Sequence, residues 1–368
     1  MTRAVALIDG EHYPPVVRDA LAALPYEWEG AILVGGTEKL REGGGDDYGV
    51  PLVDGFGAAE VVFDLSDEPV LGPVERFEWV SRALAAGLSY VGADFRFDPP
   101  QLEPFELPSI SVIGTGKRVG KTAVTTHLAR LFARDRRVVV VAMGRGGPPE
   151  PELVETPPTV EELVARSAAG RHAASDHLEI AVLAGVPTIG CRRAGGGLAG
   201  GVAVSNVAEG ARLAAELQPE LVLFDGSGAA VPPVATGRRV LVTGRADRDP
   251  YLDTYRRLIS DVVVERPALR LRPTEPLEGR VAVFTAGATD VTHLDADVVH
   301  VSANLSNRTR LRDDLVDADT YLVEVKAAGI DVVATHALAR GIRVVLAGND
   351  VEDVDDDALL ALAPVGVA

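Results

Sequence analysis

The sequence predicts an α/β fold in which helices cover parallel sheets, and three observations lead to this prediction. Short runs of Val, Ile and Leu alternate with stretches rich in Ala, Leu and Arg along the 368-residue chain, as in sheets covered by helices. Many of these runs end in Gly, as expected where a strand turns at the carboxyl edge of a sheet. One such turn is a Gly-rich loop between a strand and a helix, where open sheets bind ligands. Strands are predicted at 5–10, 31–36, 109–114, 138–144, 221–226, 239–244, 281–287, 297–303 and 343–348.

Two proline-rich stretches, 97–108 and 265–276, divide the chain. Proline cannot donate to a strand ladder and restricts the residue before it, so both stretches are predicted to be linkers. The expected domains are an N-terminal Rossmann-like α/β unit (1–98), a central unit (107–266) and a C-terminal α/β unit (277–368). The second boundary leaves an alternative open, in which the last strands complete the central sheet.

The chain is acidic, with 36 Lys and Arg residues against 54 Asp and Glu residues and a formal net charge of −18. Nucleic acids and anionic membranes are bound by basic surfaces, so neither is expected as a partner. Apolar residues make up 47% of the chain, which excludes wholesale disorder. The single cysteine, Cys191, is expected to be a small packed residue. Because no signal peptide or membrane-length apolar run is found, the expected location is the cytoplasm.

The strongest motif is the loop GTGKRVGKT, from Gly114 to Thr122, which joins a predicted strand to a predicted helix. Lysine is rare in this chain, with Lys39, Lys117, Lys121 and Lys326 as its four examples, yet two of the four lie in this loop. Glycines let backbone N–H groups turn toward phosphate oxygens, and the helix N-terminus adds positive potential. The loop therefore predicts a P-loop, in which Lys121 reaches the β- and γ-phosphates and Thr122 ligates Mg²⁺. The alternative is a Gly-rich turn with an incidental lysine. The expected nucleotide-binding residues are Thr115, Gly116, Lys117, Arg118, Val119, Gly120, Lys121, Thr122 and Ala123.

The segment LVLFDGSG, 221–228, is an apolar strand that ends in an acid and a Gly-rich turn. A carboxylate at the end of a buried strand can hold Mg²⁺ directly or through water, so Asp225 is predicted to be the second metal ligand beside Thr122. The alternative is that Asp225 only caps the strand end.

Two further segments, 142–152 and 190–201, place arginines beside Gly-rich backbone. Arginine makes forked bonds to phosphate or carboxylate, so a strongly anionic small substrate is predicted. Surface or interdomain ion pairs are the alternative role for these arginines. His177 lies at a predicted helix start, with Ser175 or Asp176 as the N-cap, and could contact substrate or be an exposed helix residue. The expected substrate-binding residues are Arg145, His177, Arg192, Arg193, Gly195 and Gly196.

The loop resembles that of dethiobiotin synthetases, a branch of P-loop proteins that includes acid-activating ligases. Four segments, VIGTGKRVGKTAV, VVAMGRGGPPEPE, GCRRAGGGLAGG and LVLFDGSG, together resemble the cyclic 2,3-diphosphoglycerate synthetases. That resemblance implies a three-layer, parallel-sheet P-loop domain flanked by the two α/β units. It also implies an ATP-dependent ligase that forms an intramolecular phosphoanhydride in 2,3-diphosphoglycerate, with Mg²⁺, K⁺ as a further candidate ion, and a homodimer. Lys121, Lys117 and Arg145 would then be the catalytic residues, with Lys117 at either the nucleotide or the substrate.

Three other functions stay open from the sequence. Another acid-activating ligase or kinase of the dethiobiotin synthetase type is the nearest one, although the extra N-terminal unit and the paired arginines, Arg192 and Arg193, argue against it. A regulatory GTPase or metallochaperone would need a guanine-reading N-K-x-D motif and Cys or His ligands, and the sequence has no such motif. A nucleotide sensor without catalysis is disfavoured by the intact Lys121, Thr122 and Asp225.

Overall fold

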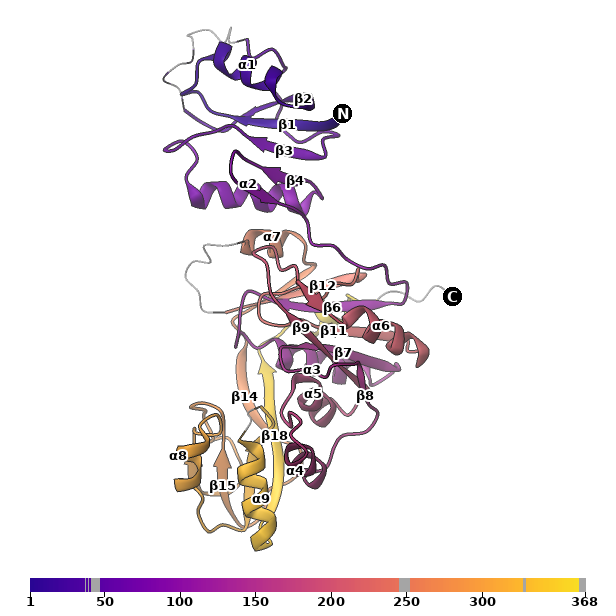
Figure 1. Cartoon of the computed structure of the whole chain (residues 1–368). Coiled ribbons are helices and arrows are strands. Elements are labelled where there is room, and N and C mark those ends of the chain that lie inside the picture. The colour runs from indigo at the N-terminus through magenta and orange to yellow at the C-terminus, as the bar shows by residue number, and fades with distance from the viewer. Residues whose placement is uncertain (37, 39, 41–46, 245–251, 327–328, 364–368) are drawn as a thin grey trace. The chain divides into compact units, whose positions relative to one another are not determined.

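The computed structural model describes residues 1–36, 38, 40, 47–244, 252–326 and 329–363 (Figure 1). The chain forms two compact units. The first unit contains residues 1–101 and 246–259, and the second contains 102–245 and 260–368. Within the described ranges, no helix has the length and apolar character needed to cross a membrane.

The first unit is a sheet of order β2-β1-β3-β4-β5. Its central strand β1 pairs in parallel with β2 and β3, and its buried residues Ala6 and Ile8 pack against Val17 and Leu21 of α1. Helix α7 packs on α2 within this unit, although the sequence assigns its residues to the central domain. The strands are β1 Thr2–Ile8, β2 Tyr26–Leu33, β3 Val61–Asp64, β4 Ser89–Val91 and β5 Arg96–Phe97, and the helices are α1 Pro14–Ala23, α2 Pro73–Ala85 and α7 Asp253–Leu258.

The second unit is built on a sheet of order β10-β9-β7-β11-β6-β12-β13, with β8 paired to β9. Strand β7 reads VVVVAMG and is buried along its whole length, because helices cover both of its faces. Val138 and Val140 pack with residues of α3, whereas Val139 and Val141 pack with residues of α6. This arrangement confirms the predicted three-layer α/β fold. The strands are β6 Ser109–Gly114, β7 Val138–Gly144, β8 Glu152–Val154, β9 Thr188–Ala194, β10 Val204–Ser205, β11 Leu221–Asp225, β12 Arg238–Thr243 and β13 Val262–Glu265, and the helices are α3 Lys121–Phe132, α4 Val160–Ala168, α5 Asp176–Ala184 and α6 Val207–Glu216.

The same unit contains a C-terminal sheet of order β14-β18-β17-β15-β16. Figure 1 shows β14 beside β18, and the two pair antiparallel from Ala268↔Glu352 to Pro273↔Ala347. The prediction of a linker over 265–276 is therefore wrong for the residues of β14. This stretch can be a strand because it lies at the edge of the sheet, and Pro273 at its end needs no ladder partner for the missing N–H. The strands are β14 Ala268–Pro273, β15 Arg280–Phe284, β16 Asp297–Ser302, β17 Thr320–Glu324 and β18 Arg343–Glu352, and the helices are α8 Arg308–Asp313, α9 Ile330–Arg340 and α10 Asp356–Leu360.

The C-terminal sheet shares a hydrophobic core with the helix that follows the phosphate loop. Val351 of β18 and Leu359 of α10 are buried in one cluster with Val124 and Leu128 of α3. The apolar surface of α3 is thus covered by C-terminal residues, so the two sheets form one compact unit.

Polar contacts join the same surfaces. Asp350 of β18 accepts from Arg130 Nη2 of α3 at 2.5 Å and pairs with Arg272 Nε of β14 at 2.9 Å. Asp356 Oδ1 lies 2.6 Å from His127 Nε2 of α3. This contact holds an acidic residue near the C-terminus against α3.

Candidate phosphate-binding site

The phosphate loop has the backbone of an anion-binding turn. It leaves buried β6 and ends at Gly120, which has a left-handed φ of +96° and caps α3. Arg118 is also left-handed, with φ of +59°. A Cβ on Gly114 would lie 2.7 Å from the Lys121 side chain, so glycine is needed where the lysine crosses the strand end. Lys121 Nζ donates to the Gly116 carbonyl at 2.8 Å, within the loop itself.

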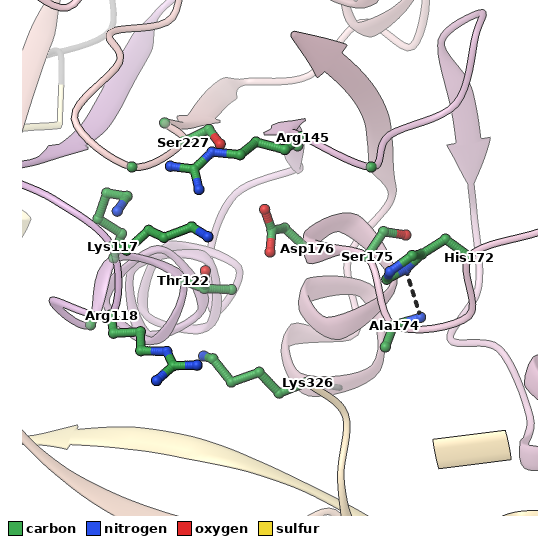
Figure 2. A pocket seen from close by; sticks show the side chains of 16 residues that line it. Lys117, Arg118, Thr122, Arg145, His172, Ala174, Ser175, Asp176, Ser227 and Lys326 are labelled. Atoms are coloured by element: carbon green, nitrogen blue, oxygen red, sulfur yellow. Dashed lines mark hydrogen bonds between the residues drawn. The ribbon is translucent and has the colours of Figure 1, made fainter. Parts of the chain in front are cut away.

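A cavity of about 340 Å³ opens over this loop (Figure 2). Its lining includes the loop, the turns after β7 and β11, and the start of α5. Asp176 is its one carboxylate among the described residues. Such a concentration of positive charge in an acidic chain fits a densely charged anion. The five cationic side chains that line the cavity are Lys117, Arg118, Lys121, Arg145 and Lys326.

Two helices begin at the cavity, α3 at Lys121 and α5 at Asp176. Their free N–H groups and dipoles favour anions. Ser175, the residue before α5, lines the cavity, and its Oγ is buried without a hydrogen-bond partner. His172 also lines the cavity, and its Nδ1 accepts the Ala174 N–H at 3.3 Å, so the neutral ring carries its proton on Nε2. The N-terminal end of α5 therefore offers hydrogen-bond donors to a ligand phosphate.

Asp225 is the last residue of β11, directly before the turn that lines the cavity. Its Oδ1 accepts the Thr125 hydroxyl at 2.8 Å, whereas its Oδ2 is buried without a partner. Burial, with the neighbouring Asp176 carboxylate, raises the pKa of Asp225 to about 7. Burial also lowers the pKa of Lys121, against the attraction of these two acids. A bound cation near Asp225 Oδ2 and Thr122 would satisfy the unpaired oxygen, so these residues fit Mg²⁺.

Two arginines meet at the turn after β11. Arg145 lines the cavity beside Ser227 (Figure 2). Arg193 donates from Nη2 to the Ser227 carbonyl at 2.7 Å and from Nη1 to the Gly195 carbonyl at 2.7 Å. A Cβ on Gly228 would collide with Arg145 Nη2, and this glycine has φ of +63°. Arg193 thus braces the turn against which Arg145 lies.

Five of the predicted substrate residues, Arg193 among them, are not among the residues that line the cavity. His177 is 2% exposed, and a Cβ on Gly190 would lie 2.6 Å from its ring. Burial lowers the pKa of His177 to about 4. Neither of its predicted roles, substrate contact or exposed helix residue, agrees with this packing, because the side chain of the second helical residue turns inward. Arg192, Gly195 and Gly196 are exposed, and the Arg192 N–H donates to Asn206 Oδ1 at 2.7 Å.

The predicted nucleotide-binding residues fall into two groups, one that supports the loop and one that lines the cavity. Thr115 Oγ1 accepts the Gly244 N–H at 3.3 Å, and Ala123 is 5% exposed in the core. Val119 packs beside Gly114 and Gly244. These residues support the loop, whereas Lys117, Arg118, Gly120, Lys121 and Thr122 line the cavity.

The cavity residues that sequence reasoning missed include His172, Ser175, Asp176 and Lys326. Asp176 was considered only as a helix cap. The rarity of lysine, which drew attention to Lys117 and Lys121, applied equally to Lys326 and could have found it. Lys39, the remaining lysine, lies outside the described residues.

Glu179, on the buried side of α5, should make the stability of the fold depend on pH. Burial raises its pKa to about 7 from the usual 4.5, against the attraction of Lys326. Because the folded-state pKa is the higher one, the stability that Glu179 contributes is present below about pH 4.5 and is lost as the pH rises through about 7. Glu179→Gln should therefore raise Tm relative to the unchanged protein more at about pH 8 than at about pH 5, by calorimetry. An equal difference at both pH values would contradict this account.

A buried strand, a Gly-rich turn and a lysine at the start of a helix, with an acid on the neighbouring strand, define a P-loop nucleotide-binding protein. Family models match three parts of the chain: the cyclic 2,3-diphosphoglycerate synthetase P-loop domain at 109–267, the C-terminal domain at 283–350, and the N-terminal domain at 3–58 and 56–98. The chain belongs to the cyclic 2,3-diphosphoglycerate synthetase family, which confirms the resemblance noted in its sequence.

Curated relatives with the name cyclic 2,3-diphosphoglycerate synthetase match along nearly the whole chain. The protein from Rubrobacter xylanophilus is 46% identical, with 98% of this chain and 97% of that protein covered. The Pyrococcus abyssi protein is 38% identical, with 95% of each covered, and the Methanothermus fervidus protein is 35% identical, with 99% and 97% covered. Among solved structures, LpxK from Aquifex aeolicus in complex with ATP has a TM-score of 0.46 and 15% identity over 79% of this chain and 94% of that one, a likeness too weak to add to the assignment.

Proposed function

We propose that this chain is an ATP-dependent ligase that converts 2,3-diphosphoglycerate into its cyclic phosphoanhydride, with release of ADP and phosphate. The observation that carries the proposal is the cavity over the P-loop, whose described lining residues include five cations and one carboxylate in a chain of net charge −18. ATP and a diphosphorylated acid are both polyanions, and a site that holds them together must neutralise their mutual repulsion.

The chemistry needs alignment and charge neutralisation more than a protein nucleophile. A phosphate oxygen of the substrate attacks the γ-phosphorus of ATP, and the bond to ADP breaks. The transferred phosphoryl group is now joined to the first substrate phosphate by an anhydride bond. An oxygen of the second substrate phosphate attacks the phosphorus of the first, the anhydride bond breaks, the ring closes and the transferred group leaves as inorganic phosphate. Lys121 neutralises the γ-phosphoryl oxygens, and Lys117 and Arg145 hold the substrate phosphates in line.

Mg²⁺ is the metal ion that these residues fit. We propose that Thr122 and Asp225 hold it, because Asp225 Oδ2 is a buried acceptor without a partner. When bound, the ion would neutralise charge that develops between the β- and γ-phosphates. Asp225 is kept in place by Thr125, which donates to its other oxygen.

The substrate-binding residues that we propose differ from those expected from the sequence. Arg145 is kept as a phosphate ligand, and Arg193 is proposed to support it through Ser227. His172 and Ser175 are added as donors at the start of α5. His177, Arg192, Gly195 and Gly196 are no longer proposed as substrate ligands.

The test is ATP turnover by the purified protein with 2,3-diphosphoglycerate, 2-phosphoglycerate, diaminopelargonate or no acceptor. We expect ADP release to depend on 2,3-diphosphoglycerate, and phosphorus NMR to show a cyclic product. Equal turnover with every acceptor would refute the proposal. Turnover with diaminopelargonate alone would instead favour a ligase of the dethiobiotin synthetase type.

Several expectations from the sequence stay predictions. They are the cytoplasmic location, the homodimer, the absence of nucleic-acid and membrane partners, and a role for K⁺. The domain ranges 1–98, 107–266 and 277–368 are likewise proposed as units of homology. In the described structure the last two share one core.

A further inference from the structure

A lysine from the C-terminal sheet lies in the cavity of the phosphate loop. Lys326 follows β17 and lines the same cavity as Lys121. The turn that carries it is fixed to the sheet, because the Val325 N–H donates to the Ala347 carbonyl at 2.9 Å and the Lys326 N–H donates to the Glu324 carbonyl at 2.9 Å. Val325 is fully buried. The backbone therefore holds Lys326 at the cavity.

The ammonium group of Lys326 has donors to spare. Glu324 is occupied elsewhere, since its two oxygens accept from the Ala286 N–H and from Asn349 Nδ2. Among the described residues, the hydrogen-bond partner of Lys326 Nζ is Glu179 Oε1, at 3.4 Å. An ammonium carries three N–H donors. One long contact to a buried carboxylate leaves the others for the cavity.

A second cation points toward Lys326. Figure 2 shows the Arg118 side chain, from the phosphate loop, extending toward the end of the Lys326 side chain. Both residues line the cavity. Two cations from different elements repel each other unless an anion lies between them. Their arrangement is therefore suited to a phosphate group that both can contact.

We propose that Lys326 is a further catalytic residue, which donates to a phosphate oxygen in the cavity opposite Arg118, and that Glu179 is its positioning residue. This inference rests on the proposed ligase function and adds the C-terminal sheet to the site. The phosphate could belong to ATP or to the diphosphorylated acceptor, and the two binding measurements below distinguish these sources. In either case Lys326 neutralises charge in the transition state from the side opposite Arg145.

The first test compares Lys326→Met and Lys326→Arg with the unchanged protein. Lys326→Met should lower kcat/KM by about 10- to 100-fold, the usual effect of losing a hydrogen bond to a charged group, and Lys326→Arg should recover part of it. Calorimetry with ADP alone and with 2,3-diphosphoglycerate alone shows which ligand binds more weakly. Weaker binding of either one supports the proposal and identifies the phosphate. Arg340→Ala, which removes an exposed cation from the end of α9, is the matched control and should keep full activity.

The second test separates phosphate binding from a purely structural ion pair. Lys326→Met alone leaves Glu179 buried without its partner and should lower Tm. The double variant Lys326→Met/Glu179→Gln removes both charges and should recover Tm. If Lys326 binds phosphate, the double variant regains Tm but not kcat/KM or ligand affinity. If it regains both, or if Lys326→Met alone leaves kcat/KM and both affinities unchanged, the proposal is overturned.

The proposed function can fail separately. If the unchanged protein makes no cyclic product, the ligase assignment fails, whereas the ADP and 2,3-diphosphoglycerate affinities of the Lys326 variants still decide whether this lysine binds phosphate. A Glu179→Gln variant whose Tm is not lowered but whose kcat is lower would identify the carboxylate as the group that orients Lys326.

Discussion

Lys121→Met should abolish ATP-dependent turnover, with a loss of kcat/KM of at least about 100-fold. Methionine keeps much of the side-chain length and removes the charge. The reason for the loss is the position of Lys121 at the start of α3, buried among phosphate-loop backbone and facing Asp225 and Asp176. A cation taken out of water interacts more strongly with phosphate than an exposed one does. The measurement is the initial rate of ADP release with saturating 2,3-diphosphoglycerate.

The matched control for Lys121→Met is Arg238→Met. Arg238 is an exposed cation on β12 of the same sheet, paired with Asp261 at 3.0 Å. Such exposed pairs contribute little to stability, so this variant should keep both activity and Tm. Retention of activity in Lys121→Met would show that the loop does not bind the transferred phosphoryl group. A far-UV circular dichroism spectrum identical to that of the unchanged protein excludes misfolding as the cause of a loss.

Asp225→Asn should have an effect of similar size, a loss of roughly 100-fold or more in kcat. The asparagine oxygen can still accept from Thr125, so the strand end should stay in place. What disappears is the charge on the buried oxygen that has no partner in the structure. Mg²⁺ should then strengthen ADP binding in the unchanged protein and have little effect on ADP binding in the variant. Calorimetry with and without Mg²⁺ measures this difference without relying on turnover.

The result that would contradict the metal assignment is specific. If Mg²⁺ strengthens ADP binding equally in Asp225→Asn and in the unchanged protein, Asp225 does not hold the ion, and its role is limited to capping the strand. Thr125→Val is a useful companion, because it removes the hydroxyl that fixes Asp225 while it keeps the carboxylate. It should weaken the effect of Mg²⁺ less than Asp225→Asn does.

Much of the fold could be predicted from the sequence, because buried parallel strands have a strong apolar signal. All the predicted strand positions fall on strands of the structure, including β7 and β11. Some of the strands that were missed have weaker signals. β9 mixes Gly, Cys and Arg, and β4 has three residues. β14 was hidden by its prolines, which an edge strand tolerates and a central strand does not.

The site residues could be predicted where they lie close together in the sequence. The phosphate loop places Lys117, Lys121 and Thr122 at one cavity because strand, turn and helix are consecutive. Residues contributed by distant segments could not be located in this way. Lys326 reaches the cavity only because β18 and α10 pack on α3, a tertiary contact with no local signal. The sequence places both Asp176 and His177 at the start of a helix but does not show which of them faces the cavity. Adjacent positions on a helix point in different directions, so Asp176 lines the cavity and His177 is buried.

The shared core between α3 and the C-terminal sheet has a thermodynamic consequence. The helix that begins at Lys121 is the surface against which Val351 and Leu359 pack, and the sheet that covers it carries Lys326 back to the same cavity. A polyanion that contacts both lysines would thus connect, without a covalent bond, two segments about two hundred positions apart in sequence. By linkage, part of its binding free energy appears as resistance of the C-terminal sheet to detachment, and any change that loosens this sheet weakens the binding of the polyanion.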